Sequence, residues 1–587
     1  MTTDVTTADA PQEAASSAVA AVEAALDRID ASTRPEVWIR VRTRAEARSA
    51  ALAVDAAFAR GDRLPLRGLT VAVKDNIDVA DLPTTAACPS FAFVPTISAP
   101  CVVALEQAGA VVIGKTNMDQ FATGLVGTRS PHGAVASVVA AGHIGGGSSS
   151  GSAAAVALGL VDLALGTDTA GSGRVPAACQ GIVGLKPTVG LVSVDGVLPA
   201  CRSFDCVSVF ARSVGLASRA LDVLAQTSDR PTPLPVRTGG PVATIGVPFD
   251  GLGPLDPAFR TLFDAAVVEA RRLGIEIVEI PFDLFQQAGA LLYGGAFVAE
   301  RHAAVGAFID AHPDDIDPSV RTIIQSGAAI RAVDLIADQE RLDHLKRRSR
   351  SLFETIDAVL VPTIPWHPTL DEVAADPIGA NSRLGIFSFA CNLLDLCAAA
   401  VPIATTPSGL PFGVTLMGPA GTDAAIAEVA ARLTGEKSTE PVVEVGADEI
   451  RLAVAGAHLT GQPLNHQLTD LGARLVATTT TAPTYRLHAL RTDPPKPGLV
   501  RVGPDGSGAS IEVEVWSLPP EGFARFVAAV PPPLAIGQVE LADGSWSPGF
   551  TCTPEALTGA TDITRHGGWR TYLATLTSPT TSMTRNL

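Results

Sequence analysis

Two short loops rich in glycine and serine, separated by a mostly apolar run, constrain the fold of this chain more than any other feature. Residues 145–152 read GGGSSSGS and run directly into AAAVALG, whereas residues 166–174 read GTDTAGSGR. The spacing between the loops leaves room for one helix and one short strand, so their hydroxyl groups can meet at one site. The first loop could also be an anion cradle at a helix N-terminus. A flexible linker is a weak alternative, because linkers do not run straight into an apolar helix.

Helical and strand-like patterns alternate along most of the chain. Residues 18–32 and 43–61 are amphipathic, which predicts helices, and residues 68–80 hold a β-branched run typical of a buried strand. Residues 101–116 read as helix, turn and strand. The same alternation continues through residues 240–249, 255–274, 352–365 and 409–433. It predicts an α/β architecture around a large sheet.

A change in composition near residue 435 predicts a second domain. A chain of 587 residues is too long for one ordinary core. We expect a loosely ordered N-terminus over residues 1–17, a main domain over 18–434 and a polar linker over 435–448. Beyond it, β-rich segments with turn signals between them predict a smaller α/β domain over 449–587.

Charge and cysteine content limit the classes of function that this chain can have. A formal net charge of −17 argues against a nucleic-acid partner, and a small anionic substrate would need a buried cation of its own. The eight cysteines show neither a CxxC pair nor zinc spacing, which predicts free thiols in a reducing compartment and no metal site. The chain begins without the pattern of a secretory signal, and its apolar tracts are shorter than the roughly 20 residues of a membrane span. We expect a cytoplasmic enzyme without a membrane partner.

Residues 109–116, GAVVIGKT, satisfy the phosphate-loop pattern GxxxxGK[ST]. That pattern needs a loop between a strand and a helix, but the intervening residues here are Ala-Val-Val-Ile, which would form the strand itself. The sequence therefore argues against a phosphate site.

Residues 145–176 closely resemble the amidase signature, which runs from a GGSS-type loop through a helix and strand to G-T-D-x-x-G-S-x-R-x-P. The blocks VAVKDNIDV, GAVVIGKTNMDQFATG, GLKPTVGLVS and GLPFGVTLMGP are similar to other blocks of the same family. The resemblance covers roughly residues 20–435. It implies a large mixed central sheet flanked by helices, an amidohydrolase activity without a cofactor, and assembly as a homodimer.

The resemblance also implies a Ser–cis-Ser–Lys triad, with Ser172 as nucleophile, Ser148 as bridging serine and Lys74 as base. An acyl-enzyme divides a difficult amide hydrolysis into two easier steps. Lysine acts as a base only when it is neutral, and desolvation in an apolar strand lowers its pKa. For a lone lysine, a salt bridge to Asp75 or Asp78 would be the default.

The family's oxyanion hole corresponds to the backbone N–H groups of Thr169, Ala170, Gly171 and Ser172. Asp168 and Arg174 are interpreted as supports of that loop. Turn and helix-cap roles are expected for Ser149, Ser150 and Ser152. Two positions depart from the commonest family form: Gly145 stands where proline is frequent, and Ala170 where glycine is frequent. Neither departure removes a reacting group.

The segments after residue 449 resemble the allophanate-hydrolase subgroup, whose C-terminal domain is γ-glutamyl-cyclotransferase-like. That subgroup binds its substrate carboxylate with a Tyr and an Arg eight residues apart, which Tyr293 and Arg301 match. The alternative for Arg301 is a surface ion pair with Glu300. The implied reaction converts allophanate to ammonia and carbon dioxide. His466 is a candidate for a later decarboxylation, although it is equally well explained as a helix-start residue.

Three other functions fit parts of the sequence. A general amidase acting on another small amide would keep the triad but would not depend on Arg301. An aminoacyl-tRNA amidotransferase subunit would need nucleic-acid contact, which the net charge disfavours. A non-catalytic binding protein would be expected to have lost part of the triad, whereas all three positions are intact.

Overall fold

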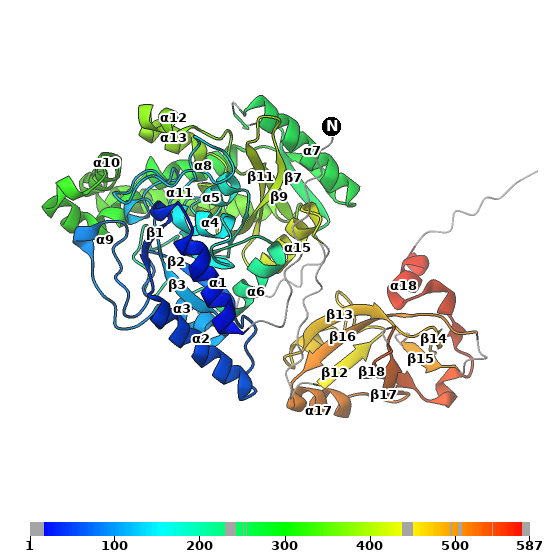
Figure 1. The fold of residues 1–587 in the computed structure, drawn as a ribbon. Helices are drawn as coiled ribbons and strands as arrows, with labels where there is room; N and C mark the ends of the chain where they lie inside the picture. The colour runs from blue at the N-terminus through cyan, green and yellow to red at the C-terminus, as the bar shows by residue number, and fades with distance from the viewer. Residues whose placement is uncertain are drawn as a thin grey trace, which may run out of the picture. The chain divides into compact units, whose positions relative to one another are not determined.

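The structure is a computed structural model that describes residues 17–577 apart from 229–241, 251, 254, 437–449, 493–495, 503–506 and 543. The chain divides into two compact units, residues 1–438 and 439–587, each described by itself (Figure 1). Nearly all of the predicted loose N-terminus and most of the predicted linker lie outside the described residues.

The first unit is built on one mixed sheet of eleven strands. In chain order they are β1 (Trp38–Val41), β2 (Thr70–Lys74), β3 (Val111–Thr116), β4 (Leu163–Asp168), β5 (Val183–Lys186), β6 (Cys206–Ala211), β7 (Thr244–Pro248), β8 (Glu276–Ile280), β9 (Ala358–Pro362), β10 (Leu396–Thr405) and β11 (Pro411–Pro419). Their order across the sheet is β1-β3-β2-β4-β6-β5-β10-β11-β9-β7-β8. Toward the β1 edge of the sheet, β2 is parallel to both β3 and β4, whereas β4 is antiparallel to β6. The predicted mixed central sheet is confirmed.

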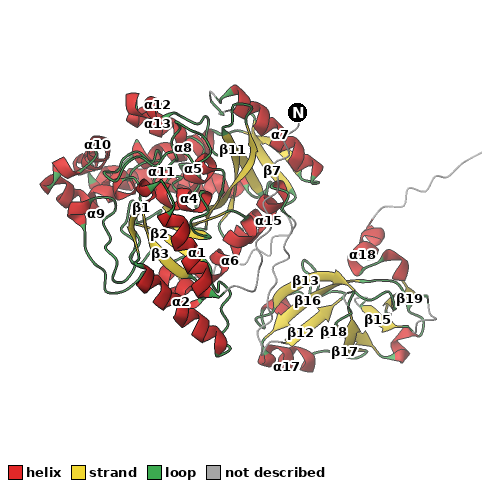
Figure 2. Ribbon diagram, in the orientation of Figure 1, coloured by secondary structure: helices red, strands yellow, loops and turns green. Residues whose placement is uncertain are grey.

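Helices flank this sheet (Figure 2). They are α1 (Ala18–Asp30), α2 (Arg44–Ala59), α3 (Pro100–Gln107), α4 (Ser150–Ala157), α5 (Val175–Gln180), α6 (Val214–Leu224), α7 (Pro257–Arg272), α8 (Asp283–Tyr293), α9 (Val298–Ala311), α10 (Pro318–Ser326), α11 (Ala332–Leu352), α12 (Leu370–Ala375), α13 (Pro377–Leu384), α14 (Ala390–Leu393) and α15 (Asp423–Leu433). Their starts follow from local chemistry. The hydroxyl of Ser17 caps α1, and Thr43 with Glu46 forms a capping box on α2.

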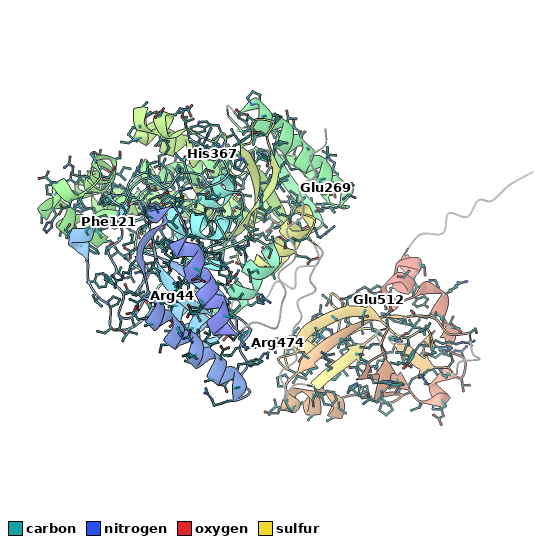
Figure 3. The ribbon with its side chains drawn as sticks, in the orientation of Figure 1. Arg44, Phe121, Glu269, His367, Arg474 and Glu512 are labelled. Carbon is teal, nitrogen blue, oxygen red and sulfur yellow. The ribbon has the colours of Figure 1, made fainter. Side chains whose placement is uncertain are left out.

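Charged side chains join the first two helices at the surface. Arg44, labelled in Figure 3, donates from α2 to Asp27 at 2.9 Å and to Asp30 at 2.8 Å. Because these groups are exposed, they orient the helix pair without adding much stability. The buried faces of the helices hold them on the sheet, since β2 and β4 are buried along their whole lengths.

The segment that matches the phosphate-loop pattern is strand β3, as expected, and not a loop. Its Lys115 is fully buried and pairs with Asp75 across 3.2 Å. Lys115 also donates to Thr84 Oγ1 at 3.0 Å and to the Pro83 carbonyl at 3.3 Å. The Lys115 ammonium therefore has a structural role, because its contacts are with residues of the surrounding fold.

The second unit holds two small sheets. The larger has the order β13-β16-β12-β18-β17, and the smaller β15-β14-β19. The bounds are β12 (Ile450–Val454), β13 (Arg474–Thr480), β14 (Tyr485–Ala489), β15 (Pro497–Arg501), β16 (Glu512–Leu518), β17 (Leu534–Glu540), β18 (Trp546–Cys552) and β19 (Thr561–Asp562), with helices α16 (His466–Thr469), α17 (Pro520–Ala528) and α18 (Trp569–Thr577). A partly buried network ties α18 to the larger sheet, because Arg570 donates to Glu512, labelled in Figure 3, and to Glu514.

All eight cysteines are free thiols, and seven of them are buried. Across the described ranges, no helix combines the length and the apolar character needed to cross a membrane.

Candidate active site

Three elements deliver the predicted triad to one edge of the sheet. Lys74 is the last residue of β2, Ser148 lies just before α4, and Ser172 follows β4. Because β2 and β4 are parallel neighbours, their carboxyl ends lie side by side. Chain direction therefore places a lysine and a serine loop together although they are far apart in sequence.

The triad forms a continuous hydrogen-bonded chain. Lys74 Nζ lies 2.8 Å from Ser148 Oγ, which lies 2.9 Å from Ser172 Oγ. Lys74 and Ser148 are fully buried, and Ser172 is 4% exposed. The Gly147–Ser148 peptide is cis. The sequence-predicted residues thus meet in a geometry in which a proton can pass from Ser172 through Ser148 to Lys74.

Burial lowers the pKa of Lys74 to about 7, because the ammonium form loses its hydration. The carboxylates of Asp119, Asp168 and Asp205 act in the opposite direction. The salt bridges considered for a lone lysine are not formed, since Asp75 pairs with Lys115 instead. Near neutral pH a substantial fraction of Lys74 is therefore neutral and able to accept a proton.

Thr167 is a partner of the lysine that the sequence analysis missed. Its hydroxyl accepts from Lys74 Nζ at 2.7 Å and from Asn76 Nδ2 at 3.4 Å. It lies on β4, within the GTD triplet. The parallel pairing of β2 with β4 brings this hydroxyl next to the lysine. No short sequence motif predicts that strand pairing.

The loop after β4 is held by Asp168 and Arg174, as predicted for its supports. Asp168 accepts from the Gly171 N–H at 2.8 Å and from the Gly173 N–H at 3.0 Å, and Arg174 donates two hydrogen bonds to it. Burial opposes ionisation of Asp168, but the attraction of Arg174 outweighs it and keeps the pKa of this carboxyl below its ordinary value. Ser388 completes the support by donating to the Ala170 carbonyl at 2.7 Å.

This arrangement corrects one part of the predicted oxyanion hole. The Gly171 N–H is already given to Asp168, so it is not free to bind an oxyanion. The N–H groups of Thr169, Ala170 and Ser172 have no acceptor within the described part of the chain. The predicted hole is thereby reduced from four donors to three.

The serines around Ser148 also differ from expectation. Ser149 stands at the N-cap position of α4 but makes no side-chain cap, and its hydroxyl bonds to the Thr167 backbone. Ser152 donates to the Leu165 carbonyl at 2.9 Å and shares a hydrogen bond with Thr116. These hydroxyls join α4 to the sheet. Local sequence could not show this, because their partners lie on other strands.

Arg301 and Tyr293 are brought together beside the triad loops. Arg301 lies on α9, is 1% exposed and donates to Tyr293 Oη at 3.2 Å and to Thr123 Oγ1 at 3.0 Å. The alternative considered for Arg301, a surface ion pair with Glu300, is not formed; Glu300 instead accepts from the Ser203 N–H. Among the described residues no carboxylate lies within 4 Å of the Arg301 guanidinium. Its Nε has no hydrogen-bond partner in that same part of the chain.

His466 begins α16 and is exposed, and its Nδ1 lies 3.0 Å from the Pro463 carbonyl. This placement matches the helix-start alternative. His458 is more enclosed: its ring stacks on Phe550 with centroids 5.1 Å apart, and its Nε2 lies 3.0 Å from Gln467. Burial lowers the pKa of His458, so this ring is neutral at physiological pH.

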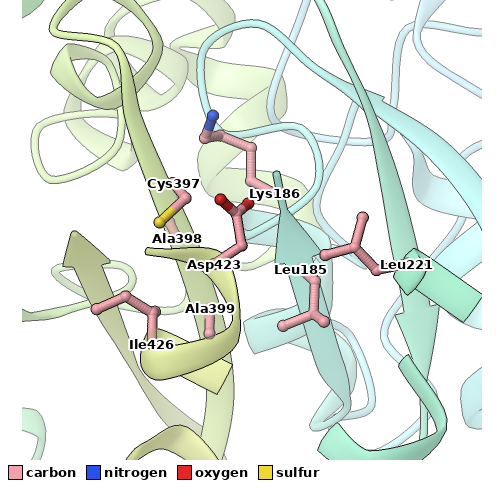
Figure 4. A pocket seen from close by; sticks show the side chains of 8 residues that line it. All are labelled: Leu185, Lys186, Leu221, Cys397, Ala398, Ala399, Asp423 and Ile426. Atoms are coloured by element: carbon pink, nitrogen blue, oxygen red, sulfur yellow. The ribbon is translucent and has the colours of Figure 1, made fainter. Parts of the chain in front are cut away.

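A cavity of about 10 Å³ lies elsewhere in the first unit, between β5, β10 and α15 (Figure 4). Its lining includes Lys186, Cys397 and Asp423. Lys186 donates to the Pro187 carbonyl at 2.6 Å, and Asp423 accepts from Thr188. The space is sufficient for about one water molecule and too small for an amide substrate.

Comparison with known proteins identifies the family to which the chain belongs. The amidase family matches residues 20–426, and the chain belongs to that family. The allophanate hydrolase C-terminal domain matches residues 450–574. The predicted amidohydrolase class and the predicted pairing of these two domain types are thereby confirmed.

Several relatives match over most of this chain. Urea amidolyase of Saccharomyces cerevisiae is 43% identical over 549 residues, covering 88% of this chain but only 30% of the relative. The crystallised allophanate hydrolase of Kluyveromyces lactis is 37% identical with a TM-score of 0.74, covering 96% of this chain and 97% of that one. Urea amidolyase of K. lactis gives a TM-score of 0.75 at 38% identity, over 96% of this chain and 36% of that chain. This chain thus spans about a third of the length of the urea amidolyases.

Proposed function

We propose that the chain hydrolyses allophanate through an acyl-enzyme on Ser172. One observation carries the choice of substrate: the buried guanidinium of Arg301 has no carboxylate within 4 Å among the described residues. A buried cation that no carboxylate contacts directly is costly unless a ligand supplies the opposite charge at contact distance. A small amide that carries its own carboxylate does so, and allophanate is such an amide.

The first half of the reaction follows the hydrogen-bonded chain. Neutral Lys74 takes a proton from Ser148, which takes one from Ser172 as its Oγ attacks the amide carbonyl. The N–H groups of Thr169, Ala170 and Ser172 face the oxyanion. Return of the proton to the leaving nitrogen releases ammonia and leaves an acyl group on Ser172.

The second half uses water. Lys74 and Ser148 remove a proton from a water molecule, whose oxygen attacks the acyl carbon and frees Ser172. The product carries two carboxylates on one nitrogen. Its nitrogen takes up two protons as two carbon dioxide molecules leave, which releases a second ammonia. We propose that His466 takes part in that decarboxylation. The domain boundaries 18–434, 435–448 and 449–587 are also part of the proposal. We also propose a cytoplasmic location, which the free cysteines support, and the absence of a nucleic-acid partner, which the net charge of −17 supports. Assembly as a homodimer is proposed from the family resemblance alone.

A panel of amides tests the substrate class. Ammonia release is measured for allophanate, biuret, malonamate, malonamide and simple amides, with Ser172→Ala as the inactive control. Malonamate and malonamide differ only in a carboxylate against an amide, so their ratio measures the preference for an anion. Activity on simple amides with none on allophanate would favour the alternative, a general amidase.

Replacement of Arg301 by alanine should lower kcat/KM for malonamate far more than for malonamide. A charged hydrogen bond contributes about 1.5–3 kcal/mol, so we expect a selective loss of roughly 10- to 100-fold. Circular dichroism and thermal unfolding check that the variant is folded. Equal losses on the two substrates would contradict a carboxylate-binding role.

A further inference from the structure

The hydrogen bonds that hold Arg301 in place within the described chain go to uncharged groups. Thr123 is fully buried, and its Oγ1 accepts from Arg301 Nη1 at 3.0 Å. The other acceptors are the Tyr293 hydroxyl at 3.2 Å and the Ala122 carbonyl at a long 3.5 Å. Thr123 therefore makes the shortest hydrogen bond to a guanidinium that has no carboxylate within 4 Å among the described residues.

Thr123 is itself fixed from several directions. Its hydroxyl donates to the Phe121 carbonyl at 3.1 Å, so its lone pairs remain free for Arg301. Its own carbonyl accepts from Arg129 at 3.0 Å, and its N–H donates to the Gln120 carbonyl at 3.0 Å. A hydroxyl with its donor and acceptor both committed cannot rotate away.

The backbone leading into Thr123 has an uncommon conformation. Phe121, labelled in Figure 3, and Ala122 have φ angles of 51° and 52°, which residues with a side chain rarely adopt. Such pairs persist only where surrounding contacts require them, and they gather at functional sites. Here the Phe121 N–H donates to the Ala86 carbonyl at 3.1 Å, and the Phe121 ring packs against Phe91.

The same short segment reaches the nucleophile. The carbonyl of Gly124, the residue after Thr123, lies 3.5 Å from Ser172 Oγ. Consecutive residues thus contact the guanidinium at one end of the site and the reacting hydroxyl at the other. A shift at Thr123 would change the separation between these two groups.

We propose that Thr123 is a positioning residue that sets the preference for anionic amides, by holding the Arg301 guanidinium at a fixed place relative to Ser172. The proposal rests on the proposed function, because it concerns the group that would bind the substrate carboxylate. Thr123 contacts no reacting atom and acts through Arg301 alone.

The test compares Thr123→Val, which removes the hydroxyl at nearly constant shape, with Thr123→Ser, which keeps it. For the full chain, we measure kcat and KM on malonamate and malonamide. Loss of a charged hydrogen bond predicts that Thr123→Val lowers the malonamate-to-malonamide ratio of kcat/KM about 10- to 100-fold. Thr123→Ser should restore most of the ratio. An unchanged ratio in Thr123→Val, or equal losses with both variants, overturns the proposal.

Thr363→Val is the matched control. Thr363 is also buried, and its hydroxyl shares a 3.0 Å hydrogen bond with Thr415, so the variant removes a similar group outside the site. It should leave the substrate ratio unchanged. A drop as large as that of Thr123→Val would show that any buried hydroxyl has this effect, and would overturn the proposal.

A second measurement covers variants that fold poorly or turn over slowly. Thr123→Ala removes the hydroxyl without adding bulk, and malonate binding is measured calorimetrically on it and on Thr123→Ser. Weaker malonate binding to the alanine variant alone supports the proposal, and equal binding refutes it. If the unmodified chain itself shows no preference for malonamate, the proposed function fails and this inference falls with it. If that preference is present and Thr123→Val keeps it, only the inference fails.

Discussion

At the scale of single residues, Lys74 shows how a fold changes the chemistry of a side chain. The sequence places it at the end of an apolar strand, and the structure buries it with two hydroxyl partners, Ser148 and Thr167. Desolvation was predictable from the apolar run Leu-Thr-Val-Ala-Val alone. The identity of the partners was only half predictable: Ser148 belongs to a recognisable motif, whereas Thr167 reaches the lysine through strand pairing.

The lowered pKa of Lys74 predicts a pH dependence of activity. Only the neutral amine accepts a proton, so kcat/KM should rise with pH through about 7, the pKa of Lys74, and then level off. This is measured as ammonia release from malonamate between about pH 5 and 9, roughly the range in which folded proteins are stable. Lys74→Met should be inactive throughout. An activity that is flat from the acid side through neutrality would contradict a lysine base.

The same pKa predicts how stability responds to pH. The lysine in the unfolded chain titrates near the ordinary value of 10.5, and in the folded chain at about 7. Between these values the unfolded chain holds a proton that the folded chain has lost, so this group makes folding more favourable as pH rises. Lys74→Met removes that slope, at most about 1.4 kcal/mol per pH unit. Denaturant unfolding of both chains across this window should show their free energies of unfolding converging or crossing, whereas a constant difference would argue that Lys74 is not desolvated.

At the scale of elements, much of the fold follows from local signals. The predicted helices at residues 18–32 and 43–61 end within about two residues of α1 and α2, a usual margin for helix boundaries, because capping side chains mark their starts. Long-range geometry was not predictable in the same way. Asp168 accepts from the Gly171 N–H only because of the way the loop folds back. The positive φ angles at Phe121 and Ala122 were not predictable either, because neither position holds a glycine or an asparagine.

The loop after β4 makes a prediction at this scale. A Cβ at Gly171 would lie 2.3 Å from Ser388 Oγ, and the φ of 125° is itself unfavourable for alanine. Gly171→Ala should therefore displace the loop that carries Ser172 and abolish ammonia release, with a lower melting temperature. Gly142→Ala is the control, because Gly142 also has a positive φ, 77°, but open space around its Cβ. It should cost about 1 kcal/mol of stability and leave activity nearly intact. Equal effects of the two changes would mean that crowding against Ser388 is unimportant.

At the scale of the whole molecule, the two units have separate hydrophobic cores. The main core of the first unit draws on residues between 66 and 433, and that of the second on residues between 452 and 569. The change of composition near residue 435 predicted this division, because a polar stretch cannot continue a core. What each unit contributes to the overall reaction could not be read from sequence, since the second unit carries no motif with a single established chemistry.

Separate cores predict that the units fold and act separately. A fragment ending at residue 438 contains the triad, Thr123 and Arg301, so it should unfold cooperatively and hydrolyse malonamate with kcat/KM close to that of the full chain. Malonamate tests the first unit alone, because its product needs no decarboxylation. With allophanate, the fragment should release the first ammonia normally and the second more slowly, as followed by the ratio of ammonia to carbon dioxide over time. Adding the fragment of residues 439–587 should restore the second release, and His466→Ala in that fragment should prevent the restoration if His466 takes part. Identical time courses for the fragment and the full chain would show that the second unit has no part in the chemistry.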